Sequence, residues 1–192
     1  MADPGHALLS YLHIPLQSGS DRVLALMRRR YTAEEYRNTV KMVRNHIPES
    51  SITTDVIVGF PGEGFEQFEE SLEFCRKSQL SRIHVFPYSV RPGTSAAHMR
   101  PQTDEHDKRE RMLAMLELSK EKTNAFQMSQ LGVVRPVLWE GSRVQHGNIV
   151  QVGLTDHYLR VYTEPNSSLT NEITRAKLTP TNNWVYAQVI DS

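Results

Sequence analysis

A short polar turn between two apolar segments is the first place in this sequence where chemistry is expected. Leu8 to Leu16 is an apolar run of strand length, and Gln17, Ser18, Gly19 and Ser20 follow it. Ser20 is a suitable N-cap for the helix that follows. In α/β proteins ligands bind at the carboxyl ends of strands, where the free N–H groups of a helix start favour anionic or polar groups. Gln17, Ser18 and Ser20 therefore either bind a ligand or only turn and cap the chain.

The most apolar strand of the sequence ends in a second turn of this kind. Ser50 to Gly59 is predicted as a strand buried on both faces because its apolar centre is continuous. Asp55 precedes that centre, and it either points into the mouth of a site or caps the chain or pairs with a nearby arginine. The turn itself consists of Gly59, Phe60, Pro61 and Gly62. Glycine permits close approach of the backbone, so we expect this turn to shape the floor of a site rather than to transfer protons.

The elements that must position these two turns alternate between strand and helix. One helix begins at Thr32, which forms a capping box with Glu35. Another is predicted over Phe65 to about Lys77, followed by a strand over Arg82 to Tyr88 and a Pro/Gly loop over Arg91 to Pro101. This order implies an α/β fold with a parallel sheet and right-handed crossovers. Its length suffices for at most half of an eight-unit barrel, which needs roughly 250 residues.

The single cysteine and the balanced charge limit the possible functions. Cys75 lies on the predicted apolar stripe of Phe65, Phe68 and Leu72, so we expect it to be a small core residue. One cysteine permits no intramolecular disulfide and makes a cytoplasmic setting the default. The 22 basic and 22 acidic residues cancel, so binding to nucleic acid or a membrane would need a local patch. No apolar run approaches the roughly 18 residues of a membrane span, and the eight histidines show no metal-ligand spacing.

The last third of the sequence changes to a period of two, which is typical of strands. After a charged helix from Asp104 to about Gln130, five short strands are predicted. They are Val133 to Trp139, Asn148 to Gly153, Tyr158 to Tyr162, Glu172 to Leu178 and Trp184 to Ile190. Together they predict a small β-barrel of about 60 residues, a kind that often binds single-stranded nucleic acid.

Cations and aromatic side chains of this barrel are its candidate RNA-binding residues. The cations are Arg135, Arg143, Arg160, Arg175 and Lys177. An equal number of acids accompanies them, so the electrostatic signal for RNA is modest. Alternation places Arg160 outward, between apolar Leu159 and Val161. The aromatic residues either present stacking surfaces or belong to the core; they are Trp139, Tyr158, Tyr162, Trp184 and Tyr186.

Four segments resemble, in order and spacing, the methylthiotransferase family of radical S-adenosylmethionine (SAM) enzymes. The first is His-Ile-Pro-Leu-Gln-Ser-Gly-Ser-Asp-Arg-Val-Leu from His13, followed by Met-x-Arg-x-Tyr-Thr from Met27. The next two are Thr54 to Glu63, and Tyr88-Ser89 with Arg-Pro-Gly-Thr from Arg91. The fourth is a tail similar to the family's TRAM domain. Together they cover nearly the whole chain after about residue 8.

The resemblance implies a partial (β/α) radical SAM barrel over residues 1–103, a connecting helix over 104–130 and a TRAM-like β-barrel over 131–192. The residues that would bind the SAM cofactor are Gln17, Ser18, Ser20, Arg29, Asp55, Gly59, Phe60 and Pro61. Arg29 occupies the family's Met-x-Arg-x-Tyr position and offers a planar fork for the methionine carboxylate. Alternatively it is a solvated surface charge, as we expect for Arg28 and Arg30. Arg91 and Thr94 either lie near the mouth of the site or only form its loop.

The sequence also departs from the pattern of this family. The family usually has Thr where this chain has Gly64. Radical SAM enzymes hold a four-iron, four-sulfur (4Fe-4S) cluster on a Cys-x-x-x-Cys-x-x-Cys loop, and one cysteine cannot supply three thiolate ligands. The chain is therefore interpreted as the C-terminal part of a longer enzyme, cut inside its barrel. We assign it no catalytic residue and no metal ligand, and expect it to be inactive alone.

The function that the resemblance implies is transfer of a methylthio group to C2 of a modified adenosine in tRNA. The partner would be the tRNA anticodon stem-loop, with no membrane involved. Gly153 to Val161 is most similar to the members that modify N6-threonylcarbamoyladenosine. Two alternatives remain open: an RNA-binding fragment without activity, and a methylthiotransferase that acts on a ribosomal protein.

Overall fold

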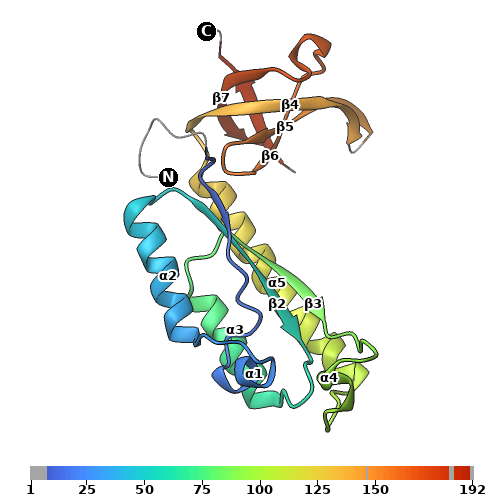
Figure 1. Ribbon diagram of the computed structural model, residues 1–192. Helices are drawn as coiled ribbons and strands as arrows, with labels where there is room; N and C mark the ends of the chain where they lie inside the picture. The colour runs from blue at the N-terminus through green and yellow to red at the C-terminus, as the bar shows by residue number, and fades with distance from the viewer. Residues whose placement is uncertain (1–7, 146, 182–183, 191–192) are drawn as a thin grey trace. The chain divides into compact units, whose positions relative to one another are not determined.

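A three-stranded sheet and a closed five-stranded barrel form the two β-structures of the described chain (Figure 1). The computed structural model describes residues 8–145, 147–181 and 184–190. By compactness the chain divides between Thr123 and Asn124. The first unit is Leu12–Thr123, and the second is residues 124 onward together with 8–11.

The sheet has the strand order β1-β2-β3, with β1 (Tyr11–His13), β2 (Ser51–Val58) and β3 (Arg82–Pro87). β2 and β3 are parallel, as the order of elements predicted, with Asp55 opposite His84 and Ile57 opposite Phe86. Side chains alternate between the faces of a strand. Thr54, Val56 and Val58 of β2 are buried on one face, whereas Asp55 and Ile57 on the other are partly exposed.

The predicted strand over Leu8 to Leu16 is wrong in its extent. β1 ends at His13, and pairing with β2 resumes only at a parallel bridge from Gln17 to Val56. The ladder is interrupted because Pro15 has no N–H to donate. The N–H of the next residue, Leu16, donates to the hydroxyl of Thr54 at 2.9 Å instead of to backbone.

The described residues before the barrel also contain five α-helices. They are α1 (Asp21–Leu26), α2 (Ala33–His46), α3 (Phe65–Lys77), α4 (Ser95–His98) and α5 (Glu105–Ser129). The predicted capping box at the start of α2 is confirmed: the N–H of Glu35 donates to the Thr32 hydroxyl at 3.2 Å. The Glu35 carboxylate in turn accepts the N–H of Thr32 at 2.7 Å. The bounds predicted for α3 are confirmed as well.

Two expectations about these helices are wrong. Phe65 does not belong to the buried stripe of α3, because it is the first residue of the helix, beyond the packed core, and is 72% exposed. The segment Arg91 to Pro101 is not all loop, since Ser95–His98 forms α4. No glycine or proline lies between Gly93 and Pro101, so one helical turn can form there.

The core of the first unit lies between one face of the sheet and helices α2, α3 and α5. Its fully buried members include Leu16, Ile52 and Ile83 from the sheet region and Met115 from α5. Cys75 packs among them, which confirms its predicted place, and burial raises the pKa of its thiol to about 12. A thiol in this environment is an inert apolar group.

All five strands predicted for the tail are present, with shifted ends. They are β4 (Val134–Gln145), β5 (Asn148–Thr155), β6 (Arg160–Thr163), β7 (Ile173–Pro180) and β8 (Val185–Val189). They close a barrel in the order β4-β5-β6-β8-β7, and a short 3₁₀ turn, η1 (Ser167–Leu169), lies between β6 and β7. β4 extends past the predicted end at Trp139 because a bulge at Gly141 bends the strand and pairing with β5 continues.

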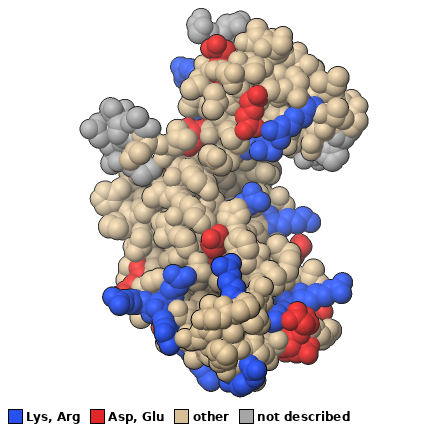
Figure 2. All heavy atoms as spheres, turned by 45° about the vertical axis from the view of Figure 1, so that its right-hand side comes forward, with Lys and Arg blue, Asp and Glu red and all other residues tan. Residues whose placement is uncertain are grey.

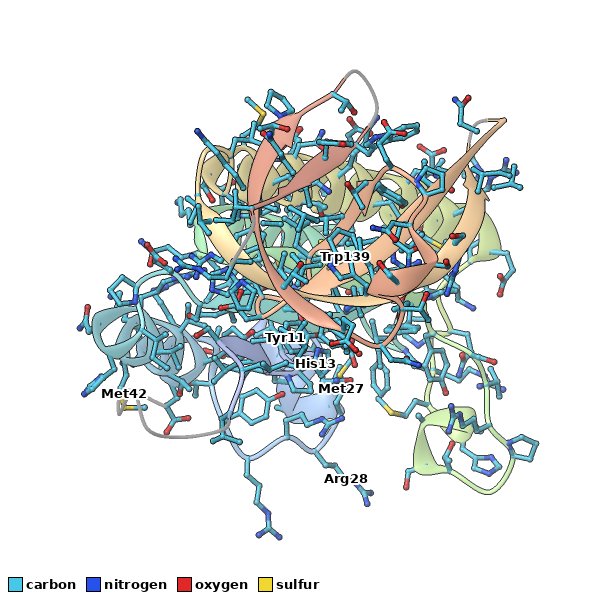
Figure 3. All side chains as sticks on the ribbon, turned by 90° about the horizontal axis from the view of Figure 1, so that it is seen from above. Tyr11, His13, Met27, Arg28, Met42 and Trp139 are labelled. Atoms are coloured by element: carbon cyan, nitrogen blue, oxygen red, sulfur yellow. The ribbon has the colours of Figure 1, made fainter. Side chains whose placement is uncertain are left out.

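The barrel interior confirms part of the alternation predicted from sequence. Leu159 and Val161 are buried while Arg160 between them is exposed. Trp139 is a core residue and not a stacking surface: it is completely buried inside the barrel (Figure 3), and its indole N–H donates to the Thr174 hydroxyl at 2.9 Å.

Gly59 should tolerate a side chain less well than a glycine of similar backbone conformation elsewhere. Gly59 has φ +74°, and an added Cβ would lie 2.3 Å from Cγ of the buried Lys108. Gly93 has φ +82° but open space around it. Both alanine variants incur the left-handed penalty of about 1–2 kcal/mol, and Gly59→Ala should lose about 1–3 kcal/mol more. Urea denaturation measures the free energy of unfolding of both variants. Equal losses of stability would show that the Lys108 side chain moves aside at no cost.

Candidate functional site

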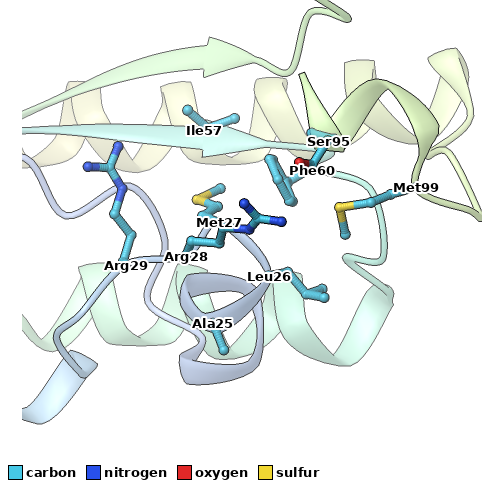
Figure 4. A pocket seen from close by; sticks show the side chains of 10 residues that line it. Ala25, Leu26, Met27, Arg28, Arg29, Ile57, Phe60, Ser95 and Met99 are labelled. Carbon is cyan, nitrogen blue, oxygen red and sulfur yellow. The ribbon is translucent and has the colours of Figure 1, made fainter. Parts of the chain in front are cut away.

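A pocket of about 530 Å³ lies at the carboxyl edge of the sheet in the first unit (Figure 4). Its walls are Ala25 to Arg29 at the end of α1, Ile57 and Phe60 at the end of β2, and Ser95, Ala96 and Met99 in and after α4. A pocket of this size can hold a small molecule or a nucleoside. Basic side chains are numerous at the end of this unit that carries α1 and α4, and an acidic patch lies beside some of them (Figure 2).

The end of α1 presents two arginines to this pocket. The N–H of Arg28 donates to the carbonyl of Ala25 and the N–H of Arg29 to that of Leu24, both at 2.9 Å. These two bonds close the helix in a Schellman motif, with Arg28 in the left-handed conformation at φ +57°. The guanidinium of Arg28 extends toward Phe60 and Met99, whereas that of Arg29 lies apart from it, near β2 (Figure 4). Arg28 was expected to be a solvated surface charge; it is exposed, and the left-handed turn also makes it part of the pocket wall.

A buried ion pair fixes the turn that carries Phe60 to the pocket wall. The Glu63 carboxylate accepts the N–H of Gly59 and contacts Nη1 of Arg111 at 3.0 Å. Arg111 also donates to the Glu63 carbonyl at 2.9 Å, and both residues are less than one-tenth exposed. Burial raises the pKa of the Glu63 carboxyl, and the Gly59 N–H and the Arg111 guanidinium oppose that rise. Phe60 is thereby held over the pocket, with its ring edge-to-face to Tyr88 at 5.1 Å.

Sequence reasoning missed this pair. Glu63 was part of a quoted motif but was given no role, and Arg111 lies 48 residues away on α5. Arg111 also falls on a helix whose apolar and charged residues do not separate into clear faces, so no local pattern marked it as buried.

The polar turn after β1 does not line the pocket. Ser18 is completely buried and its hydroxyl accepts the N–H of Ser20 at 3.2 Å. Ser20 is the residue before α1, as predicted, but its hydroxyl donates to Glu70 of α3 at 2.6 Å rather than capping the helix. Gln17, with φ +70°, pairs through its backbone with β2. The proposed cofactor contacts of these three residues remain predictions.

Asp55 lies on the partly exposed face of the sheet, and its partner is a histidine rather than the arginine that the sequence suggested. Its carboxylate contacts Nε2 of His13 at 3.3 Å. The Nδ1 atom of His13 hydrogen-bonds the Thr53 hydroxyl at 3.0 Å, and its ring lies 5.8 Å from that of His84. Burial and the neighbouring Arg82 lower the pKa of His84, which Asp55 partly opposes. Of the predicted cofactor residues, the pocket thus brings together Arg29 and Phe60; Asp55, Gly59 and Pro61 are not among its walls.

The five candidate RNA-binding cations of the barrel differ in how accessible they are. Arg135 is mostly buried and pairs with Asp156 at 3.5 Å. Arg143 and Arg160 share Glu140 at 3.7 and 3.9 Å. Arg175 and Lys177 alternate with buried residues on β7, are exposed, and have no ion pair within the described part of the chain. Among the aromatic candidates, Tyr158 is 57% exposed, and Tyr162 packs against Trp184 with ring centroids 5.5 Å apart.

Comparison with known proteins identifies the family. The model of the radical SAM superfamily matches residues 1–75. Threonylcarbamoyladenosine tRNA methylthiotransferase MtaB of Bacillus subtilis is 34% identical over 98% of this chain and 43% of its own length. The protein of the same name from Aquifex aeolicus is 41% identical over 74% of this chain and 35% of its own. These matches support a member of the methylthiotransferase family.

Another relative is named for a different modified adenosine. The tRNA-2-methylthio-N(6)-dimethylallyladenosine synthase of Acetivibrio thermocellus is 38% identical over 91% of this chain and 36% of its own length. The chain thus spans less than half the length of the curated relatives it matches. Among solved structures, the archaeal Elp3 of Methanocaldococcus infernus aligns over 89% of this chain and 52% of its own, with a TM-score of 0.44 and 10% identity. That likeness supports no conclusion about the fold.

The residues present do not fit an iron–sulfur cluster. Within the described ranges no group of three or more His, Cys, Asp or Glu side chains is placed to hold a metal ion, and the sequence has one cysteine, which is buried. The pocket does fit the ends of SAM, since Arg29 can pair with a carboxylate and Ile57 and Phe60 can contact an adenine ring. None of the described helices has the length and apolarity needed to cross a membrane.

Removal of Arg111 should destabilise the protein in a pH-dependent way. Arg111→Met leaves the Glu63 carboxylate buried without its cation, which should cost about 3–5 kcal/mol near neutral pH. The folded-state pKa of Glu63 is already raised, so the folded protein binds a proton more readily than the unfolded chain. Without Arg111 this pKa rises further. The loss should therefore grow as pH increases above the raised folded-state pKa of Glu63 and shrink in acid, where Glu63 is protonated in both proteins.

Urea denaturation between pH 4.5 and 7.5 measures this dependence. The matched control is Arg76→Met, because Arg76 pairs with Glu73 and Glu121 at 3.6 Å on the exposed surface. That variant should lose less than about 1 kcal/mol at any pH. A loss for Arg111→Met that does not vary with pH would show that Glu63 is not the group left unpaired.

Proposed function

We propose that this chain supplies the cofactor pocket and the tRNA-binding barrel of a tRNA methylthiotransferase that modifies N6-threonylcarbamoyladenosine beside the anticodon, in the cytoplasm. The observation that carries the proposal is the pocket at the carboxyl edge of the sheet, in which Arg29 and Phe60 meet. Support for the substrate comes from the match to MtaB over 98% of the chain.

In this proposal the first unit positions SAM. Arg29 would hold the methionine carboxylate, and Ile57 and Phe60 would exclude water from the adenine. When bound, SAM would supply the radical chemistry of the reaction, and the electron for it would have to come from an iron–sulfur cluster that this sequence cannot ligate. The Glu63–Arg111 pair positions Phe60 without contacting either ligand. Because the cluster ligands are absent from this sequence, the chain by itself would not turn over.

The second unit would hold the tRNA. We propose that residues 131–192 are a TRAM-like barrel after a helix over 104–130 and a partial radical SAM barrel over 1–103, of which 1–7, 146, 182–183 and 191–192 lie outside the described residues. Lys177 and Arg175 are the strongest candidates for phosphate contacts because both are exposed and unpaired within the described part of the barrel. Arg143 and Arg160 would have to leave Glu140, and Arg135 would have to leave Asp156.

Binding of an anticodon stem-loop across a salt series tests the RNA role. Arg175→Ala and Lys177→Ala should each weaken binding and lower the slope of log affinity against log salt by about 0.7–0.9 for each phosphate that the variant no longer neutralises. Lys41→Ala, an exposed charge on α2, is the control of equal charge and should change neither. Absence of binding by the unsubstituted protein would contradict the RNA role and favour the alternative of a ribosomal-protein substrate.

Reconstitution with iron and sulfide tests the claim that this chain lacks cluster ligands. We expect no stable visible absorbance from thiolate-to-iron bands, because Cys75 is buried and burial raises the pKa of its thiol to about 12. The control is Cys75→Ala treated in parallel. Absorbance in the unsubstituted protein that the alanine variant lacks would contradict this part of the proposal.

A further inference from the structure

Arg28 occupies a backbone position that is normally glycine. It is the left-handed residue of the Schellman motif that ends α1, with φ +57°. Glycine is the usual residue there because it has no Cβ to clash in this conformation. An arginine at this position makes the folded state less stable than a glycine would. Such a strained position suggests that the side chain performs a task that glycine could not.

The surroundings of Arg28 indicate what that task is. Arg28 and Arg29 both line the pocket, and none of the pocket's other walls is acidic. Within the described chain neither guanidinium has an ion pair. The two groups also lie apart, so a single small carboxylate at Arg29 would leave Arg28 unmatched (Figure 4). Two guanidinium groups that lie apart in a mainly apolar pocket favour the binding of ligands that carry two separate anionic groups.

We propose that Arg28 determines substrate specificity by binding the threonyl carboxylate of N6-threonylcarbamoyladenosine. The inference rests on the proposed function, in which Arg29 is engaged by the cofactor. The two modified adenosines named for the relatives differ in this respect: the threonylcarbamoyl group ends in a carboxylate, whereas the dimethylallyl group is neutral and apolar. The guanidinium of Arg28 also extends toward Met99, which has no role in the proposed SAM site and can contact the base. The other source of an anion is a tRNA phosphate, and the experiment separates the two.

Equilibrium binding of three nucleosides to the full chain tests the assignment. The probes are N6-threonylcarbamoyladenosine, its methyl ester and N6-dimethylallyladenosine, each with SAM present. The free acid should bind about 10- to 100-fold more tightly than the ester, as expected for a hydrogen bond to a charged group. Arg28→Gln should abolish this preference. Arg30→Gln, which removes the same charge from an exposed residue outside the pocket walls, should retain it.

Arg28→Gly separates recognition from folding. Glycine suits the left-handed conformation, so the thermal midpoint should stay unchanged or rise while the preference for the free acid is lost. A midpoint that falls would show that Arg28 supports the fold, and a retained preference would show that it does not contact the carboxylate. Either result overturns the proposal.

The remaining arms test whether Arg28 binds a phosphate or the cofactor instead. If Arg28→Gln weakens an unmodified and a modified stem-loop equally and leaves nucleoside binding unchanged, the partner of Arg28 is a phosphate. If it weakens SAM and not the nucleoside, Arg28 belongs to the cofactor site. Both results overturn the proposal while the proposed function stands. A protein that binds neither a stem-loop nor SAM would instead refute the proposed function, and the inference with it.

Discussion

The carboxylate of Glu63 is the constraint on which the candidate site depends. It lies at the point where β2 gives way to the turn that begins at Gly59, and it accepts a backbone N–H from that turn and a guanidinium from α5. A charge in this position is costly to bury, and the raised pKa of Glu63 reflects that cost. The ion pair fixes the position of the turn, because it joins Glu63 to Arg111 on α5, which lies 48 residues further along the chain. Without that connection the turn would be free to carry Phe60 away from the pocket.

The turn at Gly59 is also held in place by packing against a side chain of α5. Gly59 must be glycine because the stem of Lys108 crosses it, and Lys108 is buried on the same helix as Arg111. Lys108 keeps its ammonium on Glu105 at 2.6 Å while its apolar stem packs inward. Two basic residues one helical turn apart thus serve as packing and pairing groups, not as solvated charges. This arrangement explains why a helix without clear faces can still pack firmly against the sheet.

Local signals in the sequence predicted the elements well, and contacts between distant residues were the main failure. The capping box at Thr32, the bounds of α3 and the outward position of Arg160 follow from patterns within a few residues. The role of Arg111 depends on a partner far away in the sequence, which no periodicity reveals. The place of Arg28 in the pocket wall was missed for another reason: the end of α1 sets its left-handed conformation, and only a glycine at this position would have indicated that conformation from the sequence. The pocket wall was therefore predictable at Arg29 and Phe60, where a family motif exists, and not at Arg28.

The left-handed arginine at the end of α1 also has an evolutionary consequence. Every arginine codon becomes a glycine codon by a single-base change, so the residue best suited to this backbone is always one mutation away. That mutation should relax the backbone rather than strain it, because glycine has no Cβ to clash in the left-handed conformation. The recognition proposed for Arg28 and the stability of the chain therefore make opposite demands on this one position.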